Sequence, residues 1–245
     1  GLLMGSDTRV GDNVRLGVTG GYSRSKFDVD ARSSSGDATS YHLGLYGGTT
    51  LGPWALRAGA AYARHDVDTT RQARVAGLAD SLKSNHDAST TQVFGEVGYS
   101  LAAGDVALEP FANLAHVTLH TDAFSERGTW AALQARSGSA NVGLSTLGLR
   151  ASTAVRLGSV DATLKGMVGW RRAYGDLTPF TSVALPGATG FSDIAAVAIA
   201  KNAAVLQLGL DFAFSPRATF GVSYGGQFGG KARDQSVKAN LNVSF

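Results

Sequence analysis

The residues best suited to chemistry in this chain of 245 residues are a serine in a hydrolase-like motif and five histidines. The segment 221–225 reads GVSYG and matches G-x-S-x-G, the pattern around the nucleophile of many hydrolases. That serine functions only at a sharp strand-to-helix turn, where its hydroxyl is exposed. Here Ser223 lies within a segment whose residues alternate between apolar and polar, so we do not expect it to be a nucleophile.

Two other patterns suggest chemistry and are rejected on similar grounds. The glycine-rich segment 225–231 resembles a phosphate-binding loop, but residue 232 is alanine and no helix is predicted after it. His116 and His120 share one face of a predicted strand, yet no third ligand stands at a matching spacing. The sequence therefore predicts no catalytic residue, no metal site and no cofactor.

Composition excludes several further classes of protein. The chain has no cysteine, so disulfides and thiolate metal sites are ruled out. Its net charge of +3 is small and its basic residues are scattered, which argues against nucleic acid as a partner. No run of 18 apolar residues occurs, so no transmembrane helix is predicted.

Most of the chain alternates with a period of two, which is the period of a β-strand. Val14, Leu16, Val18 and Tyr22 fall on one parity, and mostly small or polar residues fall on the other. By this criterion and by turn residues we predict about eleven strands. They cover residues 1–9, 13–28, 39–51, 54–70, 89–101, 106–121, 140–156, 160–174, 202–214, 218–228 and 235–245.

The predicted links between strands are alternately short and long. Long links are expected at 29–38, 71–88, 122–139 and 175–201, with a tighter one at 229–234. Transmembrane up-and-down barrels have short periplasmic turns and long extracellular loops. We therefore predict one domain over residues 1–245, an all-β, antiparallel transmembrane barrel in the outer membrane of a Gram-negative bacterium.

Aromatic residues of the apolar parity test this orientation, because lipid-facing barrel walls carry an aromatic girdle at each interface. From Trp54 to Tyr62 is roughly 26 Å along a strand, or roughly 20 Å of membrane depth after tilting. The predicted girdle residues are Trp54, Tyr99, Phe212 and Phe220 near short turns, and Tyr22, Tyr41, Tyr62, Trp170 and Tyr224 near long links.

Charged residues gather on the opposite parity, where hydrocarbon cannot surround them. These predicted lumen-lining residues are Arg15, His42, Arg57, Glu96, Glu109, Arg150, Lys165, Arg171, Asp211 and Lys238. They suit a mesh of salt bridges that holds the wall in shape. They equally suit a hydrophilic conduit for an extended polar chain, and the two interpretations are compatible.

The last predicted strand alternates cleanly and ends in Phe245, so its edge suits recognition by strand addition. With it in view, the chain resembles the translocator domain of autotransporters, which export their own N-terminal passenger. The resemblance covers essentially all 245 residues. Its most telling stretches are GVTGGYSRSKFDVD (17–30), YHLGLYGG (41–48), VFGEVGY (93–99), LEPFANLA (108–115), TLGLRAS (146–152), GWRRAYGD (169–176) and residues 237–245.

The resemblance implies a twelve-stranded barrel whose lumen holds an α-helix leading to the passenger. It also implies that Phe245, with Val243 and Leu241, forms a signal read by the outer-membrane barrel assembly machinery. Other implied partners are outer-membrane lipids, lipopolysaccharide and the chain's own passenger and linker helix. Because eleven strands are predicted, we expect one further strand ahead of Gly1.

The leading hypothesis is a conduit that exports and anchors an N-terminal passenger at the cell surface. A second hypothesis is an outer-membrane barrel enzyme, a lipid hydrolase or protease with its site at the extracellular rim. His65, His116 and His120 would be its candidate bases, and no partner for them stands out in the sequence. A third hypothesis is a passive diffusion pore.

Overall fold

A computed structural model describes residues 1–29, 34–75, 77–158, 160–230 and 232–244. Within these ranges the regular elements are β-strands. No helix in the described part of the chain is long and apolar enough to cross a membrane.

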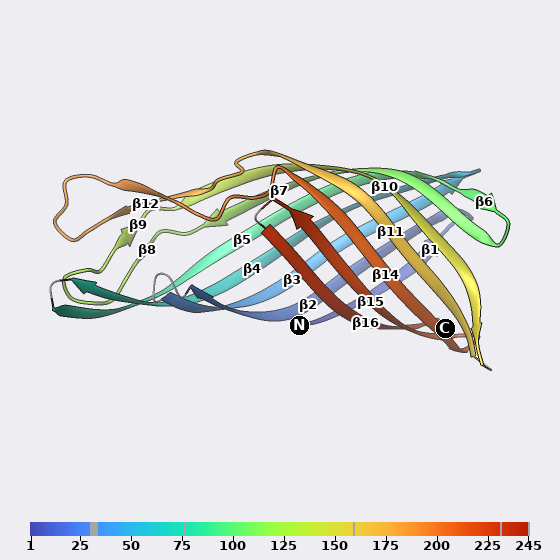
Figure 1. Ribbon diagram of the computed structural model, residues 1–245, viewed down its shortest axis with the longest axis horizontal. Coiled ribbons are helices and arrows are strands. Elements are labelled where there is room, and N and C mark those ends of the chain that lie inside the picture. The colour runs from blue at the N-terminus through green and yellow to red at the C-terminus, as the bar shows by residue number, and fades with distance from the viewer. Residues whose placement is uncertain (30–33, 76, 159, 231, 245) are drawn as a thin grey trace.

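One antiparallel sheet makes up most of the molecule (Figure 1). Its neighbouring strands follow sequence order, so each pairs with the next. The strands are β1 (Leu2–Val10), β2 (Val14–Val29), β3 (Ser34–Leu51), β4 (Trp54–Val75), β5 (Leu78–Tyr99), β7 (Val106–Thr121), β10 (Gly138–Leu157), β11 (Val160–Gly175), β14 (Asn202–Ser215), β15 (Ala218–Gly229) and β16 (Ala232–Val243). The short β6 (Leu101–Ala103) pairs with β7.

The sheet is strongly curled, and within the described residues β1 and β16 are each paired on one side only. Both strands run toward the end of the molecule that carries the short turns. Direct pairing between them would therefore be parallel. The predicted all-β, up-and-down antiparallel architecture is confirmed.

A second, smaller sheet stands at the other end of the molecule, at the left of Figure 1. It consists of β8 (Phe124–Ser125), β9 (Gln134–Ala135), β12 (Phe180–Ala184) and β13 (Ser192–Ala195). All four strands come from the links 122–137 and 176–201. We call this end the outer rim, because long loops of such walls face the outside.

The prediction of long links was wrong in two places. Strands β4 and β5 occupy nearly all of 71–88 and leave a turn at Gly77, whose φ is +85°. Strands β2 and β3 leave only 30–33, which lie outside the described residues. The link predicted at 229–234 was expected to be tighter, and β15 and β16 leave 230–231 between them. The alternation of short and long links therefore holds only for 122–137 and 176–201.

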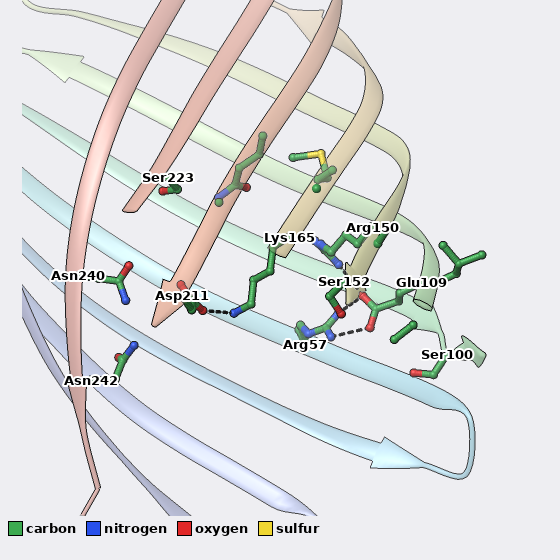
Figure 2. A pocket seen from close by; sticks show the side chains of 17 residues that line it. Arg57, Ser100, Glu109, Arg150, Ser152, Lys165, Asp211, Ser223, Asn240 and Asn242 are labelled. Atoms are coloured by element: carbon green, nitrogen blue, oxygen red, sulfur yellow. Dashed lines mark hydrogen bonds and ion pairs between the residues drawn. The ribbon is translucent and has the colours of Figure 1, made fainter. Parts of the chain in front are cut away.

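Side chains alternate between the two faces of the wall as the period of two requires. Leu16, Val18 and Leu56 are 50%, 52% and 39% exposed on the outward face. Arg57, the next residue after Leu56, lies on the concave face with residues from six other strands (Figure 2). The outward face is thus apolar, and the concave face carries the charges.

Glycines on the concave face make room for aromatic rings on neighbouring strands. A Cβ atom at Gly17 would lie 2.3 Å from the Tyr46 ring, which stands directly across on β3. Gly148 accommodates Phe111 in the same way, with 2.7 Å left to the ring. Missing side chains on the inside of the curve let the strands bend, which is how glycine introduces curvature in sheets.

The outer rim has a small core of its own, in which Leu82 is fully buried. Asp80 accepts hydrogen bonds from the backbone N–H groups of Thr129 at 2.9 Å and Ala131 at 3.1 Å. Arg71 donates to both carboxylate oxygens of Glu126, at 3.1 and 2.6 Å. These contacts fix the segment after β8 to the concave side of the β4–β5 hairpin.

Candidate functional site: the concave face

Four charged residues from four strands form the centre of the concave face. Arg57 on β4 donates to Glu96 on β5 at 2.9 Å and to both oxygens of Glu109 on β7 at 2.8 Å. Arg150 on β10 binds the same two carboxylates at 2.7 to 2.9 Å. Two cations and two anions therefore neutralise one another within one network, of which Figure 2 shows Arg57, Glu109 and Arg150. We call it the arginine–glutamate network.

Packing around this network orients its members. The Arg150 guanidinium lies 3.9 Å from the centre of the Phe111 ring, a cation–π contact. Asn113 donates to Glu96 at 3.4 Å. The side chain of Glu96 is only 8% exposed and that of Glu109 17%, so both carboxylates depend on the two arginines for their solvation.

A second charged group lies on β11, β14 and β15. Lys165 binds the carboxylate of Asp211, and Figure 2 shows this pair beside the arginine–glutamate network. Arg171 donates to Gln227 at 2.8 Å and to Thr146 at 3.2 Å. Lys238 is also a predicted lumen-lining residue. It has no ion-pair partner among the residues that the structure describes.

Histidines and a third ion pair continue the polar lining toward β1. Ser23 and His42 are 2.9 Å apart, and His65 bridges Ser40 at 2.8 Å and Thr90 at 2.9 Å. Near the short turns, Arg15 pairs with Asp7 at 3.1 Å. The concave face thus collects all ten predicted lumen residues, but in separate groups.

A polar cavity of about 490 Å³ opens between these groups. Arg57 and Glu109 line it on one side, and Ser223, Asn240 and Asn242 on the other (Figure 2). Its walls therefore come from β4, β7, β10, β11, β14, β15 and β16, the last of which is an edge strand of the sheet. Such a wet, mixed-charge space can surround a polar, extended chain without burying unpaired charge.

Aromatic residues of the outward face lie near both ends of the wall. At the short-turn end the Trp54 and Tyr99 rings are 4.8 Å apart, and Phe220 lies beside Phe214. At the outer end the Tyr22 and Tyr41 rings are 5.6 Å apart. Tyr62 and Trp170 are each 49% exposed there, whereas Phe212 and Tyr224 are half-buried.

Sequence reasoning missed several residues of the site. Asp7 was not singled out, although its parity on the first strand places it on the same face as Arg15, across from Gly17. Tyr46 donates to Asp7 at 3.2 Å, and Phe111 packs on Arg150. These concave aromatics face charged groups rather than lipid, so no girdle rule could identify them. The sequence feature that could have identified them is the glycine that stands across from each ring, Gly17 for Tyr46 and Gly148 for Phe111.

Of the three candidate bases, His120 alone contacts both a hydroxyl and a carboxylate. Its Nδ1 lies 2.9 Å from Ser139 Oγ and its Nε2 lies 3.3 Å from Asp122. His116 and His120 are exposed on the outward face of β7, as is Ser139 on β10, whereas His65 lies on the concave face of β4. His116 contacts Thr118 only weakly, at 3.4 Å. In the described part of the chain, no group of three His, Asp or Glu residues could hold a metal ion.

Comparison with known proteins decides what this architecture is. The family described as the autotransporter β-domain matches residues 1–225. The chain belongs to the autotransporter β-domain family. It is therefore a translocator domain, and its place is the outer membrane of a Gram-negative bacterium.

Relatives and solved structures agree with this assignment. An extracellular serine protease of Serratia marcescens is 36% identical over 245 residues, all of this chain but only 23% of that protein. The translocator domain therefore spans about a quarter of the length of such relatives. The translocator domain of NalP from Neisseria meningitidis has a TM-score of 0.75 at 18% identity, covering 99% of this chain and 79% of that one. The β-domain of the Bordetella autotransporter Brka has a TM-score of 0.72 at 18% identity, covering 99% and 89%.

Proposed function

We propose that residues 1–245 form one translocator domain that exports an N-terminal passenger through its lumen and anchors it at the cell surface. The mechanism is physical rather than catalytic. Lateral pairing of strands satisfies the backbone groups inside the bilayer. The mixed-charge concave face then offers a path on which a polar chain meets hydrogen-bonding groups instead of hydrocarbon.

The observation that carries this proposal is the separation of the two faces. Charged groups such as Arg57 and Asp211 gather around the concave cavity, and residues such as Val18 and Leu56 cover the outside. A water-filled conduit in lipid requires that distribution. We propose that the ten predicted lumen residues line this conduit.

We infer that the passenger of the full protein is a serine protease. This inference comes from the name of the 36% identical Serratia relative, in which the matching region is 23% of the length. We further propose that outer-membrane lipids, lipopolysaccharide and the barrel assembly machinery are partners. Leu241 and Val243, exposed on the outward face of β16, would belong to the assembly signal with Phe245, which lies outside the described residues.

Export by the full-length precursor tests the proposal. Cells producing it should display the passenger to externally added protease, and cells producing the passenger without residues 1–245 should retain it inside. An intact passenger at the surface of cells lacking the domain would refute the conduit. The enzyme hypothesis is tested separately by His120→Ala, which should leave lipid and peptide hydrolysis by the isolated domain unchanged.

A further inference from the structure

Two arginines stand out on the outward face of the wall because they have no counter-ion. On the outward faces of β11, β14, β15 and β16, Arg172 and Arg233 are the only charged residues among those that the structure describes. The remaining outward positions of these strands carry apolar, aromatic or amide side chains. Neither arginine has an ion-pair partner in the described part of the chain.

The register of the sheet places both arginines at the outer edge of the apolar band. Trp170, Ala204, Phe228 and Arg233 stand directly across from one another in a single row over four strands. Arg172 lies one position further out on the same face of β11. Aromatic residues of this row mark the interface between hydrocarbon and headgroups. The two guanidinium groups therefore lie at headgroup depth.

The Arg172 guanidinium has a hydrogen-bond donor that is free to bind an anion. Its guanidinium lies 5.3 Å from the Tyr174 ring centre, and its Nε is buried without a hydrogen-bond partner. An arginine at a membrane interface is costly unless an anion or water satisfies its five donors. Asp176, just beyond β11, already accepts from the backbone N–H of Asn141 at 2.8 Å.

The opposite sector of the wall serves as a comparison. On β2 to β5 the outward face at the same depth carries Arg24 and Arg64, but they are paired with Asp37 at 3.2 Å and Asp87 at 2.6 Å. Further aspartates, such as Asp66 and Asp68, share that face. Among the described residues, the β2–β5 sector thus balances its outward cations with aspartates (Lys26 stands directly across from Asp37), whereas the outward face of β11 to β16 carries Arg172 and Arg233 and no carboxylate.

We propose that Arg172 and Arg233 bind the phosphates of a phosphorylated glycolipid in the outer leaflet. Three strand spacings separate β11 from β16, which is roughly 14 Å in a flat sheet. That separation suits a disaccharide headgroup with a phosphate at each end, one phosphate on each arginine. The small Ala204 between Trp170 and Phe228 leaves room for an acyl chain against the wall. Guanidinium binds phosphate with two parallel hydrogen bonds, which makes arginine suited to this role.

Binding of two purified lipids to the detergent-extracted full-length precursor tests this site. The probes are bisphosphorylated lipid A and the same lipid without phosphates, measured by native mass spectrometry with EDTA present to prevent bridging by divalent cations. We expect the phosphorylated lipid to bind at least tenfold more tightly. Equal binding of the two lipids to the unaltered protein would overturn the proposal, whatever the variants do.

Variants locate the site on the wall. Arg172→Gln and Arg233→Gln should each raise the apparent Kd about tenfold, and the double variant about a hundredfold. Arg24→Gln is the matched control, since its guanidinium is already paired with Asp37, and it should change the Kd less than twofold. Unchanged affinity in the double variant, or an equal loss in the control, would place the lipid elsewhere.

This inference rests on the wall being embedded in the outer membrane, as the proposed function requires. The two can still fail separately. The double variant should export its passenger normally while binding less lipid. An unaltered precursor that binds the phosphorylated lipid through the two arginines but fails to export its passenger would contradict the conduit and leave the lipid site standing.

Discussion

Arg57 and Arg150 bind the same two glutamates, so the removal of one arginine affects three strands besides its own. Neither carboxylate would keep a full set of donors, and Glu96 is almost completely buried. This sharing explains why the residues lie together although they are up to 93 positions apart in sequence (57 to 150). A single cross-strand pair would contact one neighbouring strand only.

Arg57→Met should therefore lower the free energy of unfolding by roughly 1–3 kcal/mol, because it leaves two partly buried carboxylates with one arginine. The control is Arg156→Met, which breaks an ion pair whose side chains are 76% and 74% exposed. That change should cost less than about 1 kcal/mol. Urea midpoints in detergent measure both. Equal effects would show that the network is no more than a surface ion pair.

Asp80 gives the outer rim a dependence on pH. Burial acts to raise its pKa, but the backbone N–H groups of Ala131 and Thr129 outweigh burial, so the pKa is lowered. A carboxylate with a lowered pKa stabilises the fold at pH values above its unfolded pKa, near 3.9. That stabilisation is lost as pH falls through the lowered, folded-state value.

We accordingly expect the segment 124–133 to resist added protease at pH 5 to 8 and to become cleavable only in stronger acid. Asp80→Asn should make the same segment several-fold more sensitive at neutral pH, because an amide accepts less strongly from two N–H donors. Limited proteolysis followed by mass mapping measures both. A variant as resistant as the wild type at pH 7 would show that Asp80 does not hold the rim.

Among the elements, β2 and β3 show how the wall is bent. Gly17→Ala would place a methyl group 2.3 Å from the Tyr46 ring, so the ring or the strand must move. Overpacking of this kind costs typically 1–3 kcal/mol. Gly95→Ala on β5 is the control, because its new methyl group would meet nothing within 4 Å. Assembly is measured as the rate at which the protein acquires heat-modifiable mobility on gels. This rate should fall for Gly17→Ala and stay unchanged for Gly95→Ala. Equal rates in the two variants would show that Gly17 does not help the sheet to curve.

Sequence reasoning located the wall strands well and the rim strands poorly, for a physical reason. Where lipid lies on one side and water on the other, as at Leu56 and Arg57, alternation identifies both the strand and its faces. Beyond the membrane, no lipid covers either face of the β4–β5 hairpin, and the run from Thr69 to Arg74 is polar at nearly every position. There the strands are fixed by contacts such as Asp80 with Thr129, which local patterns cannot predict.

The contacts between charged residues on the concave face were likewise only partly predictable. Parity places Arg57, Glu96, Glu109 and Arg150 on one face, but which residues meet depends on the register of four strands. That register follows from hairpin turns such as Gly52, at φ +59°, and Gly104, at φ +61°. The sequence identifies those turns. The curvature that brings Asn240 to the same cavity as Arg57 depends on the whole sheet.

At the scale of the whole molecule, we propose that assembly into the membrane depends on the last strand of this chain. Deletion of Phe245 should sharply lower the amount of folded barrel in the outer membrane, because strand-addition recognition relies on a defined edge with terminal apolar residues. Quantitative blotting of outer-membrane fractions measures this. Val237→Ala, on the same face of β16 but away from the end, should have little effect. Normal levels of the truncated protein would count against the assembly signal.

The export, anchoring and lipid binding proposed for this domain all depend on the separation of the two faces, and the absence of cysteine makes that separation directly measurable. Single cysteines at Val18, Leu56, Arg57 and Ser223 can be reacted in intact outer membranes with a charged, water-soluble maleimide and with a lipid-soluble one. We expect positions 57 and 223 to react with the water-soluble reagent, and positions 18 and 56 to react only with the lipid-soluble one. Water-soluble labelling of Val18→Cys and Leu56→Cys with protection of the other two would contradict the separation of the two faces.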